Sequence, residues 1–265
     1  MEKSSVSGSS EDLPSAWETL AGVAGKPVAI FCDYDGTLTS IVSDPSLALL
    51  SGTVRRSLAR IAQCRILAIV SGRDLSEVRA LVDLDGVIYA GSHGFEIEGP
   101  GVERFEHPSL AGLPADLGSV QEVLRRDLAS LPGVLLQRKR YSVAVHTRTS
   151  RSERERDEAR SIAEAAVATR PRLRLQEGKE VLELRPDVDW DKGRAVSYVL
   201  DALGPSPIPL YLGDDRTDED AFAVVRARYG WAILVGDSEE TAATHTLSQT
   251  GVESFLEALA DVVCA

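Results

Sequence analysis

Short, uninterrupted apolar runs, each ending at a glycine, an aspartate or a serine, recur along this chain and limit the folds that it can adopt. They cover residues 28–32, 66–70, 87–90, 209–212 and 232–235. Because polar residues do not alternate within them, the runs are typical of strands covered on both faces, as in a parallel sheet. Helical periodicity fills several intervals, for example 53–63, where Val54, Leu58 and Ile61 share one face. Strands alternating with helices predict an α/β fold with right-handed crossovers.

The middle of the chain departs from this alternation. Its pattern predicts a helix, two short strands, a second helix and two further strands, which is an α+β arrangement. We therefore predict three parts: a disordered Ser-rich tail at 1–12, a parallel-sheet core at 13–99 and 186–265, and an inserted α+β domain at 100–185. Over 138–174 there are 11 basic and 5 acidic residues. This surplus is either a solvated helix face or a surface that attracts a phosphorylated ligand.

Charge, cysteine content and hydropathy restrict the environment of the protein. Lys and Arg number 29 and Asp and Glu 41, a net charge of −12 that disfavours nucleic-acid and membrane partners. The cysteines, Cys32, Cys64 and Cys264, are odd in number and lack metal-ligand spacing, so we predict free thiols in a reducing compartment. Apolar runs are far shorter than the ~18 residues of a membrane span, and the N-terminus lacks a signal-peptide core. We expect a cytoplasmic monomer.

Two carboxylates directly follow the first apolar run, in the segment DYDGTLT at 33–39. Spaced by two residues, Asp33 and Asp35 can point the same way from the strand end, where open α/β sheets bind ligands. Because a carboxylate is ionised at neutral pH, Asp33 could attack phosphorus without a general base. Bringing two unit anions to roughly 4 Å costs about 4 kcal/mol at an effective dielectric constant of about 20. A divalent cation and a lysine are needed to offset that repulsion.

Polar groups near other predicted strand ends could meet this need. The segment GDDRTDED at 213–220 offers carboxylates for an oxygen-rich Mg²⁺ site. Lys192 begins a predicted helix, and the hydroxyl of Ser71, at the end of the second strand, could donate to a phosphoryl oxygen. Simpler explanations stay open at this stage. Acids at 218–220 stabilise a helix dipole without further function, Lys192 could be surface charge, and DxDG also begins calcium-binding loops.

Taken together, these four segments resemble the motifs of the haloacid dehalogenase superfamily of phosphohydrolases. The resemblance implies a Rossmann-like core, an inserted cap that closes over small substrates, and an aspartyl-phosphate mechanism. It also implies Mg²⁺ as the cofactor, held by Asp33, Asp214 and the main-chain carbonyl of Asp35. The roles that it assigns are a nucleophile at Asp33, a general acid and base at Asp35, phosphoryl binding at Ser71 and Lys192, and supporting positions at Gly72, Arg73, Asp215 and Asp218.

Longer phrases are similar to the trehalose-6-phosphate phosphatase family. They lie at 33–41, with Ser40 where proline is usual, and at 71–73, 91–96, 139, 145–148, 177–186 and 213–222. The similarity implies release of phosphate from trehalose 6-phosphate in trehalose biosynthesis, with substrate contacts from His93, Glu96, Lys139, His146, Arg148, Lys179 and Glu183. Strand alternation predicts that His146 and Arg148 share one face, although a strand histidine such as His146 is often structural. Alternatives are a phosphatase for sucrose phosphate, glycosyl-phosphoglycerate or hexose phosphate, a phosphomutase, and a non-catalytic sugar-phosphate sensor.

Overall fold

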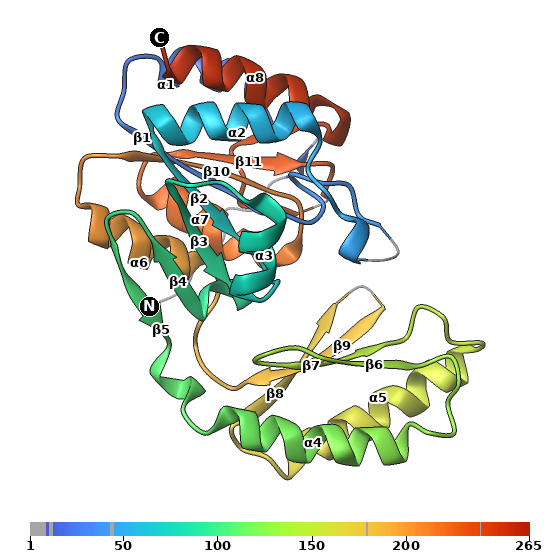
Figure 1. Ribbon diagram of the computed structural model, residues 1–265. Helices are drawn as coiled ribbons and strands as arrows, with labels where there is room; N and C mark the ends of the chain where they lie inside the picture. Colours follow the sequence, from blue (N-terminus) through green and yellow to red (C-terminus); the bar gives the residue numbers. More distant parts are fainter. Residues whose placement is uncertain (1–8, 11–12, 43–44, 179, 239) are drawn as a thin grey trace. The chain divides into compact units, whose positions relative to one another are not determined.

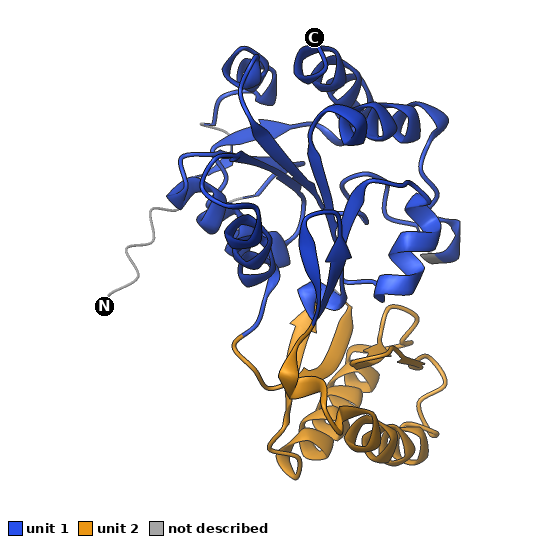
Figure 2. Cartoon of the chain, turned by 60° about the vertical axis from the view of Figure 1, so that its left-hand side comes forward, with its two compact units in different colours: residues 1–105, 190–265 blue, residues 106–189 orange. Residues whose placement is uncertain are grey.

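The computed structural model describes residues 9–10, 13–42, 45–178, 180–238 and 240–265 (Figure 1). The chain forms two compact units, unit 1 with residues 1–105 and 190–265 and unit 2 with residues 106–189 (Figure 2). Most of the predicted disordered tail, 1–12, lies outside the described residues. Within it, however, Ser10 is buried and its N–H donates to the carbonyl of Ser238, so this part of the tail is anchored.

Unit 1 contains an eight-stranded sheet in the order β12-β11-β10-β1-β2-β3-β4-β5. Its strands are β1 (Val28–Cys32), β2 (Ile66–Val70), β3 (Val87–Gly91), β4 (Glu96–Gly99), β5 (Val102–Glu106), β10 (Ile208–Gly213), β11 (Trp231–Val235) and β12 (His245–Leu247). From β12 to β3 all neighbours pair in parallel, whereas β4 runs antiparallel to β3. The predicted α/β class with a parallel sheet is confirmed.

Helices cover both faces of this sheet, as Figure 1 shows. They are α1 (Thr19–Val23), α2 (Gly52–Cys64), α3 (Leu75–Val82), α6 (Lys192–Leu203), α7 (Glu219–Ala227) and α8 (Val252–Val263). Alternate residues of β1 enter two different cores. Ile30 packs in the core that contains Leu58 of α2 and Leu256 of α8. Phe31 packs in the core that contains Val199 of α6. Burial on both faces explains why the apolar runs are uninterrupted.

The chain leaves unit 1 after Phe105, at the end of β5, and returns at Trp190. The sequence placed the first boundary at residue 100, but Pro100 and Gly101 form the turn of the β4–β5 hairpin, which extends the core sheet and moves the crossing to residues 105–106. The two crossings lie next to each other, because the ring of Phe105 stacks on Trp190 with centroids 5.1 Å apart. Phe105 also contacts the ring of Tyr198 on α6 at 4.5 Å.

Cys64 and Cys264 form a disulfide, so the prediction of free thiols is wrong for these two residues. They end α2 and follow α8, and because these helices pack side by side, residues 200 apart in sequence have Cα atoms 5.4 Å apart. Cys32 keeps a free thiol, and burial raises its pKa. Among the described residues, none of the helices is both long enough and apolar enough to cross a membrane.

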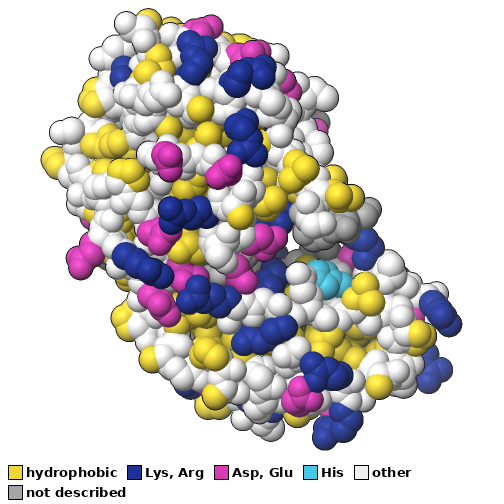
Figure 3. Space-filling view, viewed as in Figure 1, with side chains coloured by type: hydrophobic (Ala, Val, Ile, Leu, Met, Phe, Trp, Pro, Cys, Tyr) yellow, Lys and Arg dark blue, Asp and Glu magenta, His cyan; other side chains and the backbone are white. Residues whose placement is uncertain are grey.

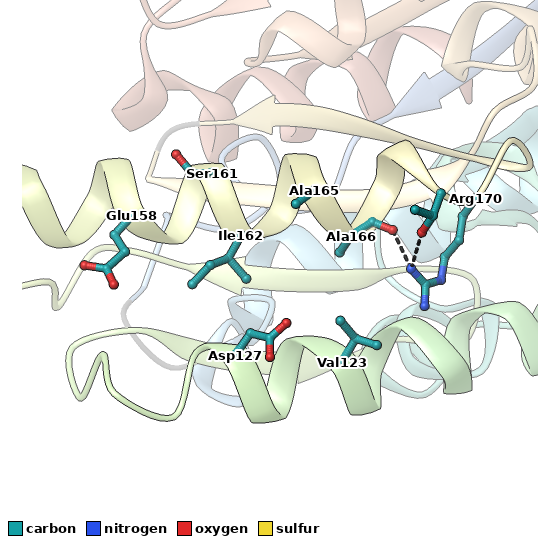
Figure 4. A pocket seen from close by; sticks show the side chains of 9 residues that line it. Val123, Asp127, Glu158, Ser161, Ile162, Ala165, Ala166 and Arg170 are labelled. Carbon is teal, nitrogen blue, oxygen red and sulfur yellow. Dashed lines mark hydrogen bonds between the residues drawn. The ribbon is translucent and has the colours of Figure 1, made fainter.

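Unit 2 is a four-stranded antiparallel sheet, β6-β7-β9-β8, with two helices packed against it. In chain order its elements are α4 (Leu113–Asp127), β6 (Leu135–Arg138), β7 (Val143–His146), α5 (Glu153–Ala168), β8 (Leu173–Gly178) and β9 (Val181–Pro186). Figure 3 shows several Lys and Arg side chains and fewer acidic ones on the visible face of unit 2. A groove of about 450 Å³ lies between α4 and α5 (Figure 4), and none of the predicted site residues lines it.

Candidate active site

Side chains predicted to act together follow neighbouring strands of unit 1. Asp33 follows β1, Ser71 follows β2, and Asp214 follows β10. Because β1 pairs in parallel with both β2 and β10, these three residues leave the sheet at the same edge. Lys192 reaches the same edge from the first position of α6. The structure therefore brings together the four segments that the sequence singled out.

Lys192 is a buried cation between two carboxylates, and not surface charge. Its Nζ lies 3.0 Å from Oδ1 of Asp33 and 2.8 Å from Oδ1 of Asp218, and 2% of its side chain is exposed. Gly193 lets the start of α6 pack closely on α7, because a Cβ at residue 193 would meet the carbonyl oxygen of Asp220 at 2.4 Å. Burial lowers the pKa of Lys192, but the charges of Asp218 and Asp33 raise it more, so the amine stays protonated.

Asp218 is fully buried, and four donors saturate its carboxylate. Oδ1 accepts from Nζ of Lys192 and from the hydroxyl of Tyr211, at 2.8 and 2.6 Å. Oδ2 accepts from the N–H groups of Asp214 and Asp215, at 3.1 and 3.0 Å. Stabilisation of a helix dipole does not require this burial, which groups Asp218 with Lys192 and Asp33. Asp215 caps the 3-10 turn Arg216–Asp218.

Oxygen atoms suited to a divalent cation gather beside Lys192. Asp33, Asp214 and Asp218 each offer a carboxylate oxygen, and these atoms lie within 4.8 Å of one another. Burial outweighs the attraction of Lys192 and raises the pKa of Asp33 well above its usual value. Burial also raises the pKa of Asp214 to about 7, although a hydrogen bond from Thr37 Oγ1 opposes the rise. Because four donors already occupy Asp218, the buried carboxylate of Asp33 and the half-buried one of Asp214 are the ones that fit a hard divalent ion such as Mg²⁺.

Gly36 allows Asp214 to occupy this position. Its φ is +85°, and a Cβ at residue 36 would lie 2.0 Å from Oδ2 of Asp214. We expect Gly36→Ala to weaken Mg²⁺ binding at least about tenfold, because Asp214 must move, and to cost about 1–2 kcal/mol of stability from backbone strain. Calorimetric titration with Mg²⁺ measures the first effect. Gly25→Ala is the control, because Gly25 also has positive φ (+66°) but a Cβ there meets no atom within 4 Å. Equal Mg²⁺ affinities in the two variants would contradict the expectation.

Arg73, a supporting position according to the resemblance, binds Asp35. Its Nε and Nη2 donate to the two carboxylate oxygens of Asp35 at 2.7 and 2.6 Å. The guanidinium also pairs with Glu77 and lies over the ring of Tyr34, 5.4 Å from the centroid. The side chain of Asp35 is 41% exposed, so it has room to rotate away from this pair.

The segment after β2 packs against the segment after β3. Ser71 is buried, and its Oγ accepts from the N–H of Arg73 at 3.1 Å. A Cβ at Gly72 would meet the imidazole of His93 at 2.8 Å, so His93 lies directly over Gly72. His93 adopts a φ of 58° and donates its N–H to the carbonyl of Ser71. Glu96, at the start of β4, is 2% exposed. These residues place His93 beside the predicted phosphoryl-binding segment.

One face of the unit 2 sheet carries most of the other predicted substrate residues. Gln137, Ala144 and Glu183 lie opposite one another on three adjacent strands and share this face. Lys139 Nζ lies 3.0 Å from Oε1 of Glu183, which also accepts from Ser142 Oγ at 2.6 Å. On the same face, Nε2 of His146 lies 2.8 Å from Oε1 of Gln137. We call Gln137, Lys139, His146 and Glu183 the polar sheet face.

Two predicted substrate residues do not belong to this group. Arg148 was expected to share a strand face with His146, but β7 ends at His146 and Arg148 lies in the following turn. Its side chain is 52% exposed and pairs with Glu180. Strand alternation therefore does not extend to position 148. Lys179 lies outside the described residues.

Comparison with known proteins decides the family. The family model described as Trehalose-phosphatase matches residues 31–252, which is most of the chain.

This chain belongs to the trehalose-phosphatase family.

A curated relative, the trehalose-phosphate phosphatase of Mycobacterium bovis (strain BCG / Pasteur 1173P2), is 41% identical over 260 residues. The match covers 94% of this chain and 66% of the relative, so the chain spans about two thirds of that protein. The C-terminal domain of Candida albicans trehalose-6-phosphate phosphatase superimposes with a TM-score of 0.79 at 23% identity, covering 94% of this chain and 98% of that one. A haloacid dehalogenase-like hydrolase from Bacteroides thetaiotaomicron gives 0.60 at 17% identity, covering 88% and 99%. The resemblance found in the sequence is confirmed.

His146 of this trehalose-phosphatase family member is expected to be neutral at neutral pH. Burial, and next the charge of Lys139, lower its pKa from the usual 6.5. An NMR titration of His146 should therefore show a midpoint below 6.5. Replacing Lys139 by methionine should move the midpoint upward, because the positive charge that opposes protonation is removed. A midpoint at or above 6.5 in the unaltered protein would contradict this expectation.

Sequence reasoning missed several residues of the family member's site. Tyr211 donates to Asp218, and Thr37 Oγ1 donates to Asp214 at 2.8 Å. Gln249 Nε2 in turn donates to the carbonyl of Thr37 at 3.2 Å. Thr37 lies inside the DYDGTLT segment, so its hydroxyl was a visible signal. Tyr211 gave a weaker signal: it is the hydroxyl-bearing residue of an apolar run that ends two residues before Asp214.

Proposed function

We propose that this protein is a Mg²⁺-dependent phosphatase of trehalose biosynthesis that hydrolyses trehalose 6-phosphate to trehalose and phosphate. The observation that carries the proposal is Lys192, buried between Asp33 and Asp218 at a strand end beside Asp214. A buried ammonium next to a strand-end carboxylate offsets the repulsion between that carboxylate and an incoming phosphate ester. Family membership supports the choice of substrate.

The proposed reaction has two steps. A carboxylate oxygen of Asp33 forms a bond to phosphorus while the bond from phosphorus to the sugar oxygen breaks, and Asp35 gives its proton to that oxygen. Asp35 then takes a proton from water, whose oxygen bonds to phosphorus as the bond to Asp33 breaks. Ser71 and Lys192 hold the phosphoryl oxygens. Asp33, Asp214 and the main-chain carbonyl of Asp35 would hold Mg²⁺, which would supply positive charge against the phosphate.

Asp35 requires a rearrangement within this scheme. In the structure its carboxylate accepts two hydrogen bonds from Arg73. To donate a proton, Asp35 has to leave Arg73 and turn to the leaving oxygen, which its partial exposure permits. In this scheme Arg73 holds Asp35 until it turns to the leaving oxygen. Gly72, Asp215 and Asp218 shape the surrounding loops.

The proposal assigns the sugar to unit 2, acting as a cap. The polar sheet face presents a carboxylate, an ammonium, an amide and an imidazole, which together donate to and accept from sugar hydroxyls. Polar groups of this kind discriminate strongly once a bound sugar covers them, because the wrong sugar leaves them unpaired. His93 and Glu96 of unit 1 are proposed to complete substrate recognition. The cytoplasmic location, the monomeric state and the lack of nucleic-acid partners stay predictions.

The test of this function is phosphate release with Mg²⁺ from a panel that contains trehalose 6-phosphate, sucrose 6-phosphate and glucose 6-phosphate. We expect release to be fastest from trehalose 6-phosphate and to stop when Mg²⁺ is removed by a chelator. Equal rates on all members would exclude the specificity but not the chemistry. An isomerised sugar phosphate without free phosphate would indicate a mutase, and binding without turnover would indicate a sensor.

Glu183→Gln is expected to lower kcat/KM for trehalose 6-phosphate roughly 10- to 100-fold, because a charged hydrogen-bond partner of Lys139 and of the sugar is lost. With p-nitrophenyl phosphate, which has no sugar, the same variant should keep its rate. Glu177→Gln is the matched control, because Glu177 makes an exposed ion pair with Arg160 on another part of unit 2. A similar loss on both substrates would rule out a role of Glu183 in sugar recognition.

A further inference from the structure

Tyr211 is a buried side chain of the core whose oxygen belongs to the site. Its ring stacks near Phe31, with centroids 6.5 Å apart, and meets Phe222 edge-on at 5.7 Å. Its hydroxyl donates to Oδ1 of Asp218 at 2.6 Å. The side chain is fully buried, and the proposed reaction gives the hydroxyl no part in bond making. The ring of Tyr211 therefore contacts the apolar core, whereas its hydroxyl contacts the site, so the hydroxyl can be removed without changing the ring contacts.

Asp218, the acceptor of this hydrogen bond, connects two parts of the proposed machinery. Oδ1 is shared between the hydroxyl of Tyr211 and Nζ of Lys192. Oδ2 accepts from the N–H groups of Asp214 and Asp215, and so fixes the loop that carries Asp214. The orientation of the Asp218 carboxylate therefore fixes the position of the Lys192 ammonium and the backbone position of Asp214, whose carboxylate is proposed to bind metal.

We propose that Tyr211 is a positioning residue which, through Asp218, holds Lys192 and the Asp214 loop in place for phosphoryl transfer. The inference rests on the proposed phosphatase function. With two donors on Oδ1, Asp218 shares Lys192 with Asp33. Without the hydroxyl, the full charge of Oδ1 faces Lys192, which then moves toward Asp218 and away from Asp33. Burial and the charge of Asp218 raise the pKa of Tyr211 well above its usual value, so the hydroxyl keeps its proton.

The test is Tyr211→Phe, which removes one oxygen and keeps both ring contacts. We expect kcat for phosphate release from trehalose 6-phosphate to fall roughly 10- to 100-fold, with KM changed by less than about threefold. We also expect the Kd of Mg²⁺, measured by calorimetry without substrate, to rise about tenfold, because the Asp214 loop is less well held.

Tyr89→Phe is the matched control for losing a buried hydroxyl. Tyr89 is 3% exposed in the same unit, and its hydroxyl donates to the carbonyl of Leu84 at 2.8 Å. Both variants should lose a similar amount of thermal stability, but Tyr89→Phe should keep kcat and Mg²⁺ affinity. Changes of equal size in kcat and Kd for the two variants would overturn the proposal, because they would show a general effect of destabilisation.

A double-mutant cycle tests whether Tyr211 acts through Asp218. Asp218→Asn alone should lower kcat and Mg²⁺ affinity, and adding Tyr211→Phe to it should cost little more. Losses that multiply would overturn the proposal. If Tyr211→Phe does not fold, the Mg²⁺ affinity of Asp218→Asn still decides, and an unchanged value overturns it. If the unaltered protein releases no phosphate from any sugar phosphate, the proposed function fails, whereas the Mg²⁺ titrations still test Tyr211.

Discussion

Replacing Asp33 with asparagine is expected to lower kcat for phosphate release by on the order of 10⁴-fold or more, the scale seen when a nucleophile is removed. An amide is a poor nucleophile and a weak metal ligand, so the first bond to phosphorus does not form. The protein should fold, because asparagine keeps the shape, and burial already disfavours the charge that is removed, as the raised pKa of Asp33 shows.

Two measurements separate this outcome from unfolding. Thermal unfolding should show that Asp33→Asn is at least as stable as the unaltered protein, while phosphate release is lost. Asp201→Asn is a suitable control, because Asp201 is a surface carboxylate, 69% exposed, that pairs with Arg228. Retention of a tenth or more of the activity by Asp33→Asn would show that another group attacks phosphorus.

Lys192→Met is expected to have the largest effect on stability, with a loss of about 3–5 kcal/mol at pH 8. The reason is that Asp33 and Asp218 stay buried but lose the cation between them. Burial raises the pKa of Asp33 in the folded state well above its usual value, and the charge of Lys192, which opposes that rise, is absent from the variant. The folded variant therefore gains stability by taking up protons at low pH and loses it as the pH rises, so it should be relatively more stable at pH 5.

Denaturant unfolding at the two pH values measures this effect. Lys26→Met is the control, because Lys26 lies over the ring of Trp231 at the surface, and its loss should cost about 1 kcal/mol or less at both pH values. A Lys192→Met protein that is as stable as the unaltered protein at pH 8 would show that the buried carboxylates have another source of compensation. Phosphate release by this variant should also be lost.

Much of unit 1 could be predicted because its signals are local. The run at 28–32 is the strand Val28–Cys32, and it is apolar throughout because alternate residues enter two cores. Asp33 follows it directly, and parallel strands necessarily end at one edge. Because β1 and β10 are parallel neighbours, Asp33 and Asp214 meet at that edge. The sequence therefore predicts where the site lies, but not the contacts between the side chains within it.

The contacts that could not be predicted depend on three-dimensional approach between distant residues. The pairing of Asp35 with Arg73 depends on side-chain rotamers, and nothing in the spacing of the two residues favours it over contact with phosphate. The disulfide depends on how two helices end, and an odd cysteine count points away from it. In unit 2, Arg148 was misplaced because the end of β7 is set by pairing with β9 and not by the sequence pattern.

The stacked rings of Phe105 and Trp190 have a consequence for how such proteins diversify. The chain leaves the core sheet beside Phe105 and returns beside Trp190, so the two ends of unit 2 are adjacent and unit 2 is one insertion in the core. An insertion with adjacent ends can become longer or shorter, or be replaced, with little change in the entropic cost of closing the chain between those ends. On the proposed assignment of sugar contacts to unit 2, changes there can alter sugar choice without disturbing the strands that carry Asp33 and Asp214.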